Sequence, residues 1–151
     1  MTLPFLNVVE EDVFQLVNGC LIGWLLLIAF PRWKHTPSVV LLVSAFYALL
    51  YTLLLPSSIF GTLPPGSSFT SLQGIVNLFS SKRAVLAGWV HYVSFDLLAA
   101  RFILLDSQSA GIPHLFIVWI FPLTLLLGPA GLTSYLLLKP LVSGSKSKKA
   151  Q

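Results

Sequence analysis

Five ionisable side chains that could transfer protons lie within and just after one apolar stretch of the sequence. They are His91, Asp96, Arg101, Asp106 and His114. At membrane depth such groups cost about 2.5–3.5 kcal/mol each on insertion scales, so they face the protein interior and mark candidate functional sites. Asp96 lies nearest the middle of the stretch and bears the largest penalty. It is therefore the first candidate.

Asp96 can act as an acid or as a base. Desolvation would keep its carboxyl group protonated at neutral pH, whereas a nearby cation such as Arg101 would keep it ionised. The alternative for Asp96 is a structural tether that fixes helix register, and the alternative for His91 is a hydrogen-bonded interior histidine. Arg101 could instead extend toward Asp106 and the aqueous boundary.

The spacing of these residues limits which of them can interact directly. Each step of five residues rotates a helix by about 140° and advances it by about 7.5 Å. His91, Asp96 and Arg101 therefore do not form one stripe of i,i+4 pairs. Their partners must lie on other helices, in the backbone or in a ligand.

The elements that position these residues follow from length and composition. The 151 residues suit one compact domain. A 56% hydrophobic content, 9% charged residues and a mean hydropathy of +0.86 leave too few polar side chains for a water-soluble globule. Four runs are long enough to span a bilayer as helices, 13–30, 39–55, 84–105 and 115–138. We predict an all-α membrane protein, with a four-transmembrane-helix bundle as a single domain over residues 1–142.

The connections between the spans have their own signatures. Segment 31–37 is short and has a proline at each end, so the first two spans should form a helical hairpin. Segment 56–68 is rich in Pro and Gly and should be a loop that begins at Pro56. Apolar residues at helical spacing over 69–79 predict a short amphipathic or re-entrant helix before the third span. The composition of 143–151 is typical of a disordered basic tail.

The fourth run is interrupted by Pro122 and by Gly-Pro-Ala-Gly at 128–131. Proline removes a backbone hydrogen bond, and small residues let another backbone or a flat ligand approach closely. A kinked wall beside the third helix would form a long apolar groove. The alternative is ordinary proline tolerance and small-residue packing in a membrane helix.

The distribution of lysine and arginine predicts the orientation in the membrane. With four straight spans, both termini share one side. That side holds Lys82, Arg83, Lys139, Lys146, Lys148 and Lys149, and the other side holds Arg32 and Lys34. We therefore expect the termini to face the cytoplasm or its equivalent.

Several kinds of chemistry lack the residues they need. The basic residues form no face with interleaved aromatics, so nucleic acid is not an expected partner. Cys20 is the only cysteine, no span contains a lysine and the chain has three histidines, so we expect no disulfide, no lysine Schiff base and no multi-histidine iron centre. No phosphate-binding or dinucleotide fingerprint occurs either. We expect no metal and no other cofactor, which leaves acid–base chemistry.

The segments around the candidate residues resemble a known family of membrane proteins. Residues 89–101, which read Trp-Val-His-Tyr-Val-Ser-Phe-Asp-Leu-Leu-Ala-Ala-Arg, are similar to the abscisic-acid-deficient family implicated in neoxanthin synthesis. The similarity includes Asp106, Ile-Pro-His at 112–114 and the segments 72–81 and 125–131. It begins at about Phe14, and its most specific element is the Trp-x-His-x4-Asp-x4-Arg pattern.

The resemblance implies four membrane helices and a role in carotenoid metabolism, with xanthophylls as the substrate class. In plants it implies a plastid location, in the thylakoid or the envelope, and violaxanthin as the precursor of neoxanthin. In other hosts the expected location is the cell membrane or a photosynthetic membrane. Residues 1–12 hold three acids and no Lys or Arg, so we expect no transit peptide there.

The implied reaction converts a 5,6-epoxide into an allenic alcohol and is redox-neutral. One proton goes onto the epoxide oxygen and another leaves the neighbouring polyene carbon, so one acid and one base suffice. We expect Asp96 and His91 in these roles, in either order, with Arg101 as electrostatic support. The expected substrate-binding residues are Trp89, Asp106, His114, Pro129 and Gly131.

Two other functions fit the same sequence. One is a carotenoid- or lipid-binding accessory protein without turnover, and the other is a small proton-coupled transporter with Asp96 as its ion site. The expected partners are a carotenoid or other apolar polyene and membrane lipids. An oligomer and a pigment–protein partner are both left open.

Overall fold

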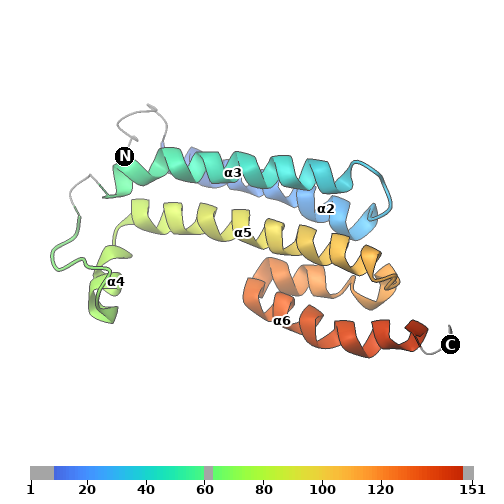
Figure 1. The fold of residues 1–151 in the computed structure, drawn as a ribbon. Helices are drawn as coiled ribbons and strands as arrows, with labels where there is room; N and C mark the ends of the chain where they lie inside the picture. Colours follow the sequence, from blue (N-terminus) through green and yellow to red (C-terminus); the bar gives the residue numbers. More distant parts are fainter. Residues whose placement is uncertain (1–8, 60–62, 148–151) are drawn as a thin grey trace. The chain divides into compact units, whose positions relative to one another are not determined.

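The computed structural model describes residues 9–59 and 63–147, and it is all-helical, as predicted. Its elements are α1 (Glu10–Val17), η1 (Asn18–Cys20), α2 (Leu21–Ala29), α3 (Thr36–Ile59), α4 (Leu72–Leu78), α5 (Lys82–Ser109), η2 (His114–Phe116) and α6 (Ile120–Ser147) (Figure 1). Four stretches are long and apolar enough to cross a membrane: Glu10–Ala29, Thr36–Pro56, Lys82–Ser109 and Ile120–Ser143. The predicted short helix before the third span is α4.

The chain divides into two compact units, and each is described by itself. Unit 1 comprises residues 1–19 and 45–93, and unit 2 comprises residues 20–44 and 94–151. Helices α3 and α5 contribute residues to both units.

In unit 1, a tyrosine side chain of α3 forms a hydrogen bond with the backbone of α1. The hydroxyl of Tyr47 donates to the carbonyl of Leu16 at 2.9 Å, just before the 3-10 turn η1. A Cβ on Gly19 would lie 2.9 Å from that hydroxyl, so the glycine makes room for it. Tyr47 is 2% exposed, so its hydroxyl needs this partner.

Helix α4 is a short helix with exposed apolar residues, and its predicted position in the membrane interface stays a prediction. The Ser71 side chain caps it by accepting a hydrogen bond from the Gly74 amide at 3.0 Å. Gly74 and Leu78 are buried, whereas Leu72 and Val76 of the helix are exposed. Phe69 before the helix and Phe79 at its C-cap are exposed as well. Exposed apolar residues of this kind are stable where lipid covers them.

Two predicted boundaries are wrong. Helix α3 continues through Pro56 to Ile59, whereas the prediction ended it before Pro56. A proline in the last turn of a helix removes a single intrahelical hydrogen bond, which is why the helix can run on for another three residues. At the other end of the chain, α6 extends to Ser147 and so includes the first five residues of the predicted tail. Residues 148–151 lie outside the described part.

In unit 2, a reciprocal pair of serines joins α3 to α5. Ser44 donates to the carbonyl of Ser94 at 2.8 Å, and Ser94 donates to the carbonyl of Ser44 at 3.0 Å. Both serines are 1% exposed. Small hydroxylated side chains allow membrane helices to approach closely and to satisfy their own polar groups at the same time. This pair fixes the register of α3 against α5.

Helix α6 is broken at Leu127, and the chain folds back there. Leu127 has φ −143° and ψ 54°, which are not helical values. A Cβ on Gly131 would lie 2.6 Å from the Cα of Thr124, although seven residues of straight helix would separate these positions by about 10 Å. Figure 1 shows the second limb running back beside the first. The fourth apolar stretch is therefore a helical hairpin with limbs 120–126 and 128–147.

This reversal corrects the predicted grouping of the basic residues. The prediction assumed a straight fourth span and placed Lys139 on the same side as Lys82. In unit 2 the ammonium group of Lys139 lies 2.7 Å from Asp106, in the last turn of α5. At the same end, Gln108 donates to the carbonyl of Pro31 at 2.7 Å. Lys139 therefore lies at the end of unit 2 that carries the connection 31–35.

Candidate functional site

Tyr51 on α3 and His91 on α5 line the same cavity of unit 1, which has a volume of about 320 Å³. Their ring centroids lie 5.3 Å apart. The other lining residues are apolar: Leu55, Phe69, Leu78, Phe79, Ala84, Ala87 and Gly88. The cavity is therefore an apolar pocket with two groups that can transfer a proton.

Small residues on α5 create the space in this cavity. Ala84, Ala87, Gly88 and His91 follow one another at helical spacing, so they share one face of α5. A Cβ on Gly88 would lie 2.9 Å from Cε1 of Phe79, so the glycine lets that ring pack against the helix. The His91 side chain is exposed, so the cavity is open to the surroundings of the protein.

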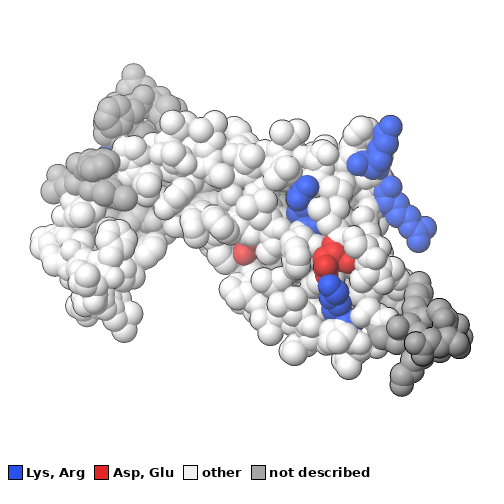
Figure 2. All heavy atoms as spheres, viewed as in Figure 1, with Lys and Arg blue, Asp and Glu red and all other residues white. Residues whose placement is uncertain are grey.

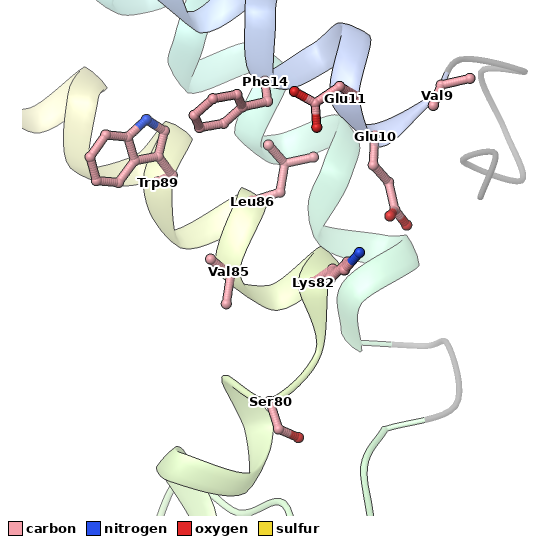
Figure 3. A pocket seen from close by; sticks show the side chains of 9 residues that line it. All are labelled: Val9, Glu10, Glu11, Phe14, Ser80, Lys82, Val85, Leu86 and Trp89. Atoms are coloured by element: carbon pink, nitrogen blue, oxygen red, sulfur yellow. The ribbon is translucent and has the colours of Figure 1, made fainter.

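Trp89, a predicted substrate-binding residue, lines a different cavity from His91, and its predicted role stays a prediction. This second cavity, of about 550 Å³, lies between α1 and the first turns of α5 (Figure 3). Helix α5 contributes Lys82, Val85, Leu86 and Trp89 to it. Each of these residues lies two positions before a residue of α5 that lines the first cavity. Two residues correspond to about 200° of rotation, so the two cavities lie on opposite faces of α5.

Asp96 lies in unit 2 and is 8% exposed. Its carboxylate lies directly against Gly128, because a Cβ at that glycine would overlap Oδ1 of Asp96. Gly128 and Pro129 begin the second limb of α6. The N-terminus of a helix carries a partial positive charge, which stabilises a carboxylate.

The predicted proton-transfer pair of His91 and Asp96 stays a prediction. The two residues belong to different units. His91 has Tyr51 as its neighbour within unit 1, and Asp96 has Gly128 within unit 2.

Arg101 binds the backbone at the start of α3. Its Nε donates to the carbonyl of Pro37 at 2.8 Å, and the side chain is partly buried. A charged donor to a backbone carbonyl is among the stronger hydrogen bonds in proteins. Arg101 therefore fastens the first turn of α3 to α5.

Asp106 holds the second limb of α6 against α5. Its Oδ2 accepts a hydrogen bond from the Tyr135 hydroxyl, and its carboxylate pairs with Lys139 at 2.7 Å. Tyr135 is completely buried and packs edge-on against Phe102. These contacts form a latch made of Asp106, Tyr135 and Lys139.

His114 connects the end of α2 with the start of α6. Its Nε2 lies 3.2 Å from the carbonyl of Ile28, and its ring stacks on Phe121 with centroids 5.5 Å apart. Burial lowers the pKa of His114 below its ordinary value, and the charge of Arg32 lowers this pKa further. The hydrogen bond to Ile28 acts in the opposite direction.

The remaining predicted residues lie at the reversal of α6. Pro129 is exposed, and Gly131 is buried against Thr124. Gly131 therefore allows the tight turn between the limbs. Within residues 9–59 and 63–147, no group of three His, Cys, Asp or Glu side chains could hold a metal ion.

A protein-family model, ABA4-like, described as ABA DEFICIENT 4-like, matches residues 12–135. No curated protein and no solved structure matches the chain. The matched residues run from α1 to the second limb of α6 and include the cavity of Tyr51 and His91, Asp96, Asp106 and Tyr135. Lys139 lies outside the matched range, as do Val9, Glu10 and Glu11 of the other cavity.

Proposed function

The chain belongs to the ABA4-like family, whose membership implies a role related to neoxanthin and carotenoid metabolism, and on that premise we propose that it isomerises an epoxy-carotenoid. The proposed site is the cavity of Tyr51 and His91. The observation that carries the proposal is that these are the two polar side chains in a lining that is otherwise apolar.

The size of the cavity favours one end group of a carotenoid. Small-molecule sites commonly measure about 300–1,000 Å³. At about 320 Å³ this cavity is at the low end and would take a single substituted ring. The polyene would then extend from the open side of the cavity along apolar helix surface. His91 is exposed on that open side.

The proposed chemistry needs one acid and one base. The carbon–oxygen bond of the epoxide nearer the polyene breaks, and the oxygen stays on the other ring carbon and gains a proton. The adjacent polyene carbon loses a proton, and its electron pair forms the new cumulated double bond. His91 is the proposed base and Tyr51 the proposed acid, because a phenol is a donor at neutral pH.

Tyr51 takes the place that the sequence-based hypothesis gave to Asp96, because it shares a cavity with His91. The test is turnover of an epoxy-xanthophyll by protein in lipid nanodiscs, normalised to folded protein. Tyr51→Phe and His91→Gln should each lower turnover by about 10²-fold or more, since a positioned acid or base contributes about 10²–10⁴-fold. Binding of the pigment should persist.

The matched control is His35→Gln, because His35 is exposed in the connection between α2 and α3. This variant should keep the turnover of the parent protein. If Tyr51→Phe and His91→Gln stay within about twofold of the parent, far below the effect of an acid or base, the isomerase proposal fails.

A second candidate function is proton-linked transport through Asp96. The observation that favours it is a buried carboxylate at the break of a discontinuous membrane helix, an arrangement that transporters use for substrate and ion sites. Asp96→Asn would then abolish proton uptake by proteoliposomes and leave isomerisation unchanged. Loss of isomerisation with no effect on proton flux would return Asp96 to the catalytic role expected from the sequence.

A further inference from the structure

The cavity lined by Trp89 differs in polarity from one end to the other. Figure 3 shows Glu10, Glu11 and Lys82 toward one end and Trp89 at the other, with Phe14 between them. Its apolar part includes Val85 and Leu86. The cavity is therefore amphiphilic, with a charged end and an apolar end.

This cavity lies at the level where two membrane spans begin. Glu10 is the first residue of the span Glu10–Ala29, and Lys82 is the first residue of the span Lys82–Ser109. Charged residues at the start of a span mark the headgroup region of a bilayer. The charged end of the cavity is thus expected among lipid headgroups, and the apolar end among acyl chains.

The charges at the polar end are only partly paired. Glu10 forms an ion pair with Arg83 at 3.0 Å. Glu11 accepts a hydrogen bond from the neutral amide of Gln15 at 3.2 Å. Within the described residues, Lys82 has no ion pair. One carboxylate and one ammonium group therefore remain available to a ligand.

We propose that this cavity binds the headgroup of a zwitterionic aminophospholipid. The phosphate would pair with Lys82 and the primary ammonium with Glu11, while an acyl chain lies against Phe14 and Trp89. An anionic headgroup without an amine would be repelled by Glu11, and an uncharged sugar headgroup would leave both charges uncompensated. The site is independent of the proposed isomerase cavity, because the two lie on opposite faces of α5.

The test is lipid retention by the full chain. The protein is placed in nanodiscs with equal parts of phosphatidylethanolamine, phosphatidylglycerol and a monogalactosyl lipid, and the lipids it retains are counted by native mass spectrometry. The parent protein should retain phosphatidylethanolamine in preference to both others. Lys82→Gln should weaken retention of this lipid roughly two- to fivefold, the size expected for one partly exposed ion pair.

Glu11→Gln should act differently from Lys82→Gln. It removes the partner of the ammonium group and the repulsion of an anionic headgroup, so it should abolish the preference for phosphatidylethanolamine over phosphatidylglycerol. The control is Lys34→Gln, which removes an exposed lysine from the connection 31–35 and should change neither retention nor preference. Both Glu11 and Lys82 are exposed, so the variants should fold, and circular dichroism checks this.

Three outcomes would overturn the proposal. The first is equal retention of all three lipids by the parent protein, and the second is a preference for the galactolipid. The third is unchanged retention in both folded variants. The isomerase proposal is tested by turnover of Tyr51→Phe and His91→Gln, so either proposal can fail without the other.

Discussion

The carboxylate of Asp96 on α5 lies directly against the backbone of Gly128, at the point where α6 breaks. The contact has no room for a side chain at position 128. It therefore couples the position of a buried acid to the shape of the fourth apolar stretch.

Gly128→Ala should destabilise the protein, because its Cβ would overlap the Asp96 carboxylate. Overpacking of this kind commonly costs about 1–3 kcal/mol. In an Asp96→Ala background the same change should cost much less, and thermal unfolding in detergent measures both values. Gly23→Ala is the comparator, since its Cβ would meet only side-chain carbons of Leu97 and Val43, the nearest being Cδ2 of Leu97 at 3.0 Å. Equal costs of Gly128→Ala in the two backgrounds would rule out the coupling.

The reversal of α6 predicts which positions share a side of the membrane. In a Cys20→Ser background, Lys34→Cys and Ser143→Cys should react with an impermeant maleimide from the same side. The reason is that Lys139, one turn before Ser143, pairs with Asp106 at the end of unit 2 that carries Pro31. Labelling of the two positions from opposite sides would instead indicate a straight fourth span.

Arg101→Gln should lower stability and leave turnover per folded molecule unchanged, because Arg101 donates to the Pro37 carbonyl. A hydrogen bond from a charged donor contributes about 1.5–3 kcal/mol. Arg101→Lys should restore part of the loss, since it keeps the charge but not the geometry of the guanidinium. A fall in turnover at unchanged stability would favour the electrostatic role predicted from the sequence.

Stability should fall as the pH drops toward 5, and His114 should contribute to this fall. Burial lowers the pKa of His114 in the folded protein below its ordinary value of about 6.5. The unfolded chain then binds more protons in this range, so the contribution of His114 is fully present above about pH 6.5 and is lost as the pH falls through the lowered pKa. His114→Gln should flatten the thermal unfolding profile between pH 8 and 5, whereas His35→Gln, which changes an exposed side chain, should not.

Hydropathy predicted the four apolar stretches because lipid leaves an unpaired backbone no alternative partner, so each run must be helical. It could not predict the reversal at Leu127, since both limbs are apolar and hydropathy alone reads residues 115–138 as one span. The glycines and prolines at 128–131 indicated a kink. What distinguishes a kink from a reversal is the contact of Asp106 with Tyr135 and Lys139, which depends on tertiary structure.

The sequence identified one residue of the candidate site by its type, but it could not identify the residue that lies beside it. His91 stood out as an ionisable group in an apolar segment, but Tyr51 resembled any other aromatic residue of a membrane helix. Their proximity depends on how α3 packs on α5 in unit 1. Trp89 and His91 are two positions apart in the sequence, and only their places on α5 show that they line different cavities.

The fold-back of α6 also constrains how the chain enters the membrane during synthesis. The insertion machinery responds to windows of about 20 apolar residues, and Ile120–Ser143 fulfils this requirement as one segment. Threading that segment straight across the bilayer would carry Lys139 away from Asp106. We therefore expect the two limbs to insert together as a hairpin, because that arrangement keeps Lys139 within reach of Asp106. In this sense the pairing of Asp106 with Lys139 would favour one of two membrane topologies open to the same sequence during biogenesis.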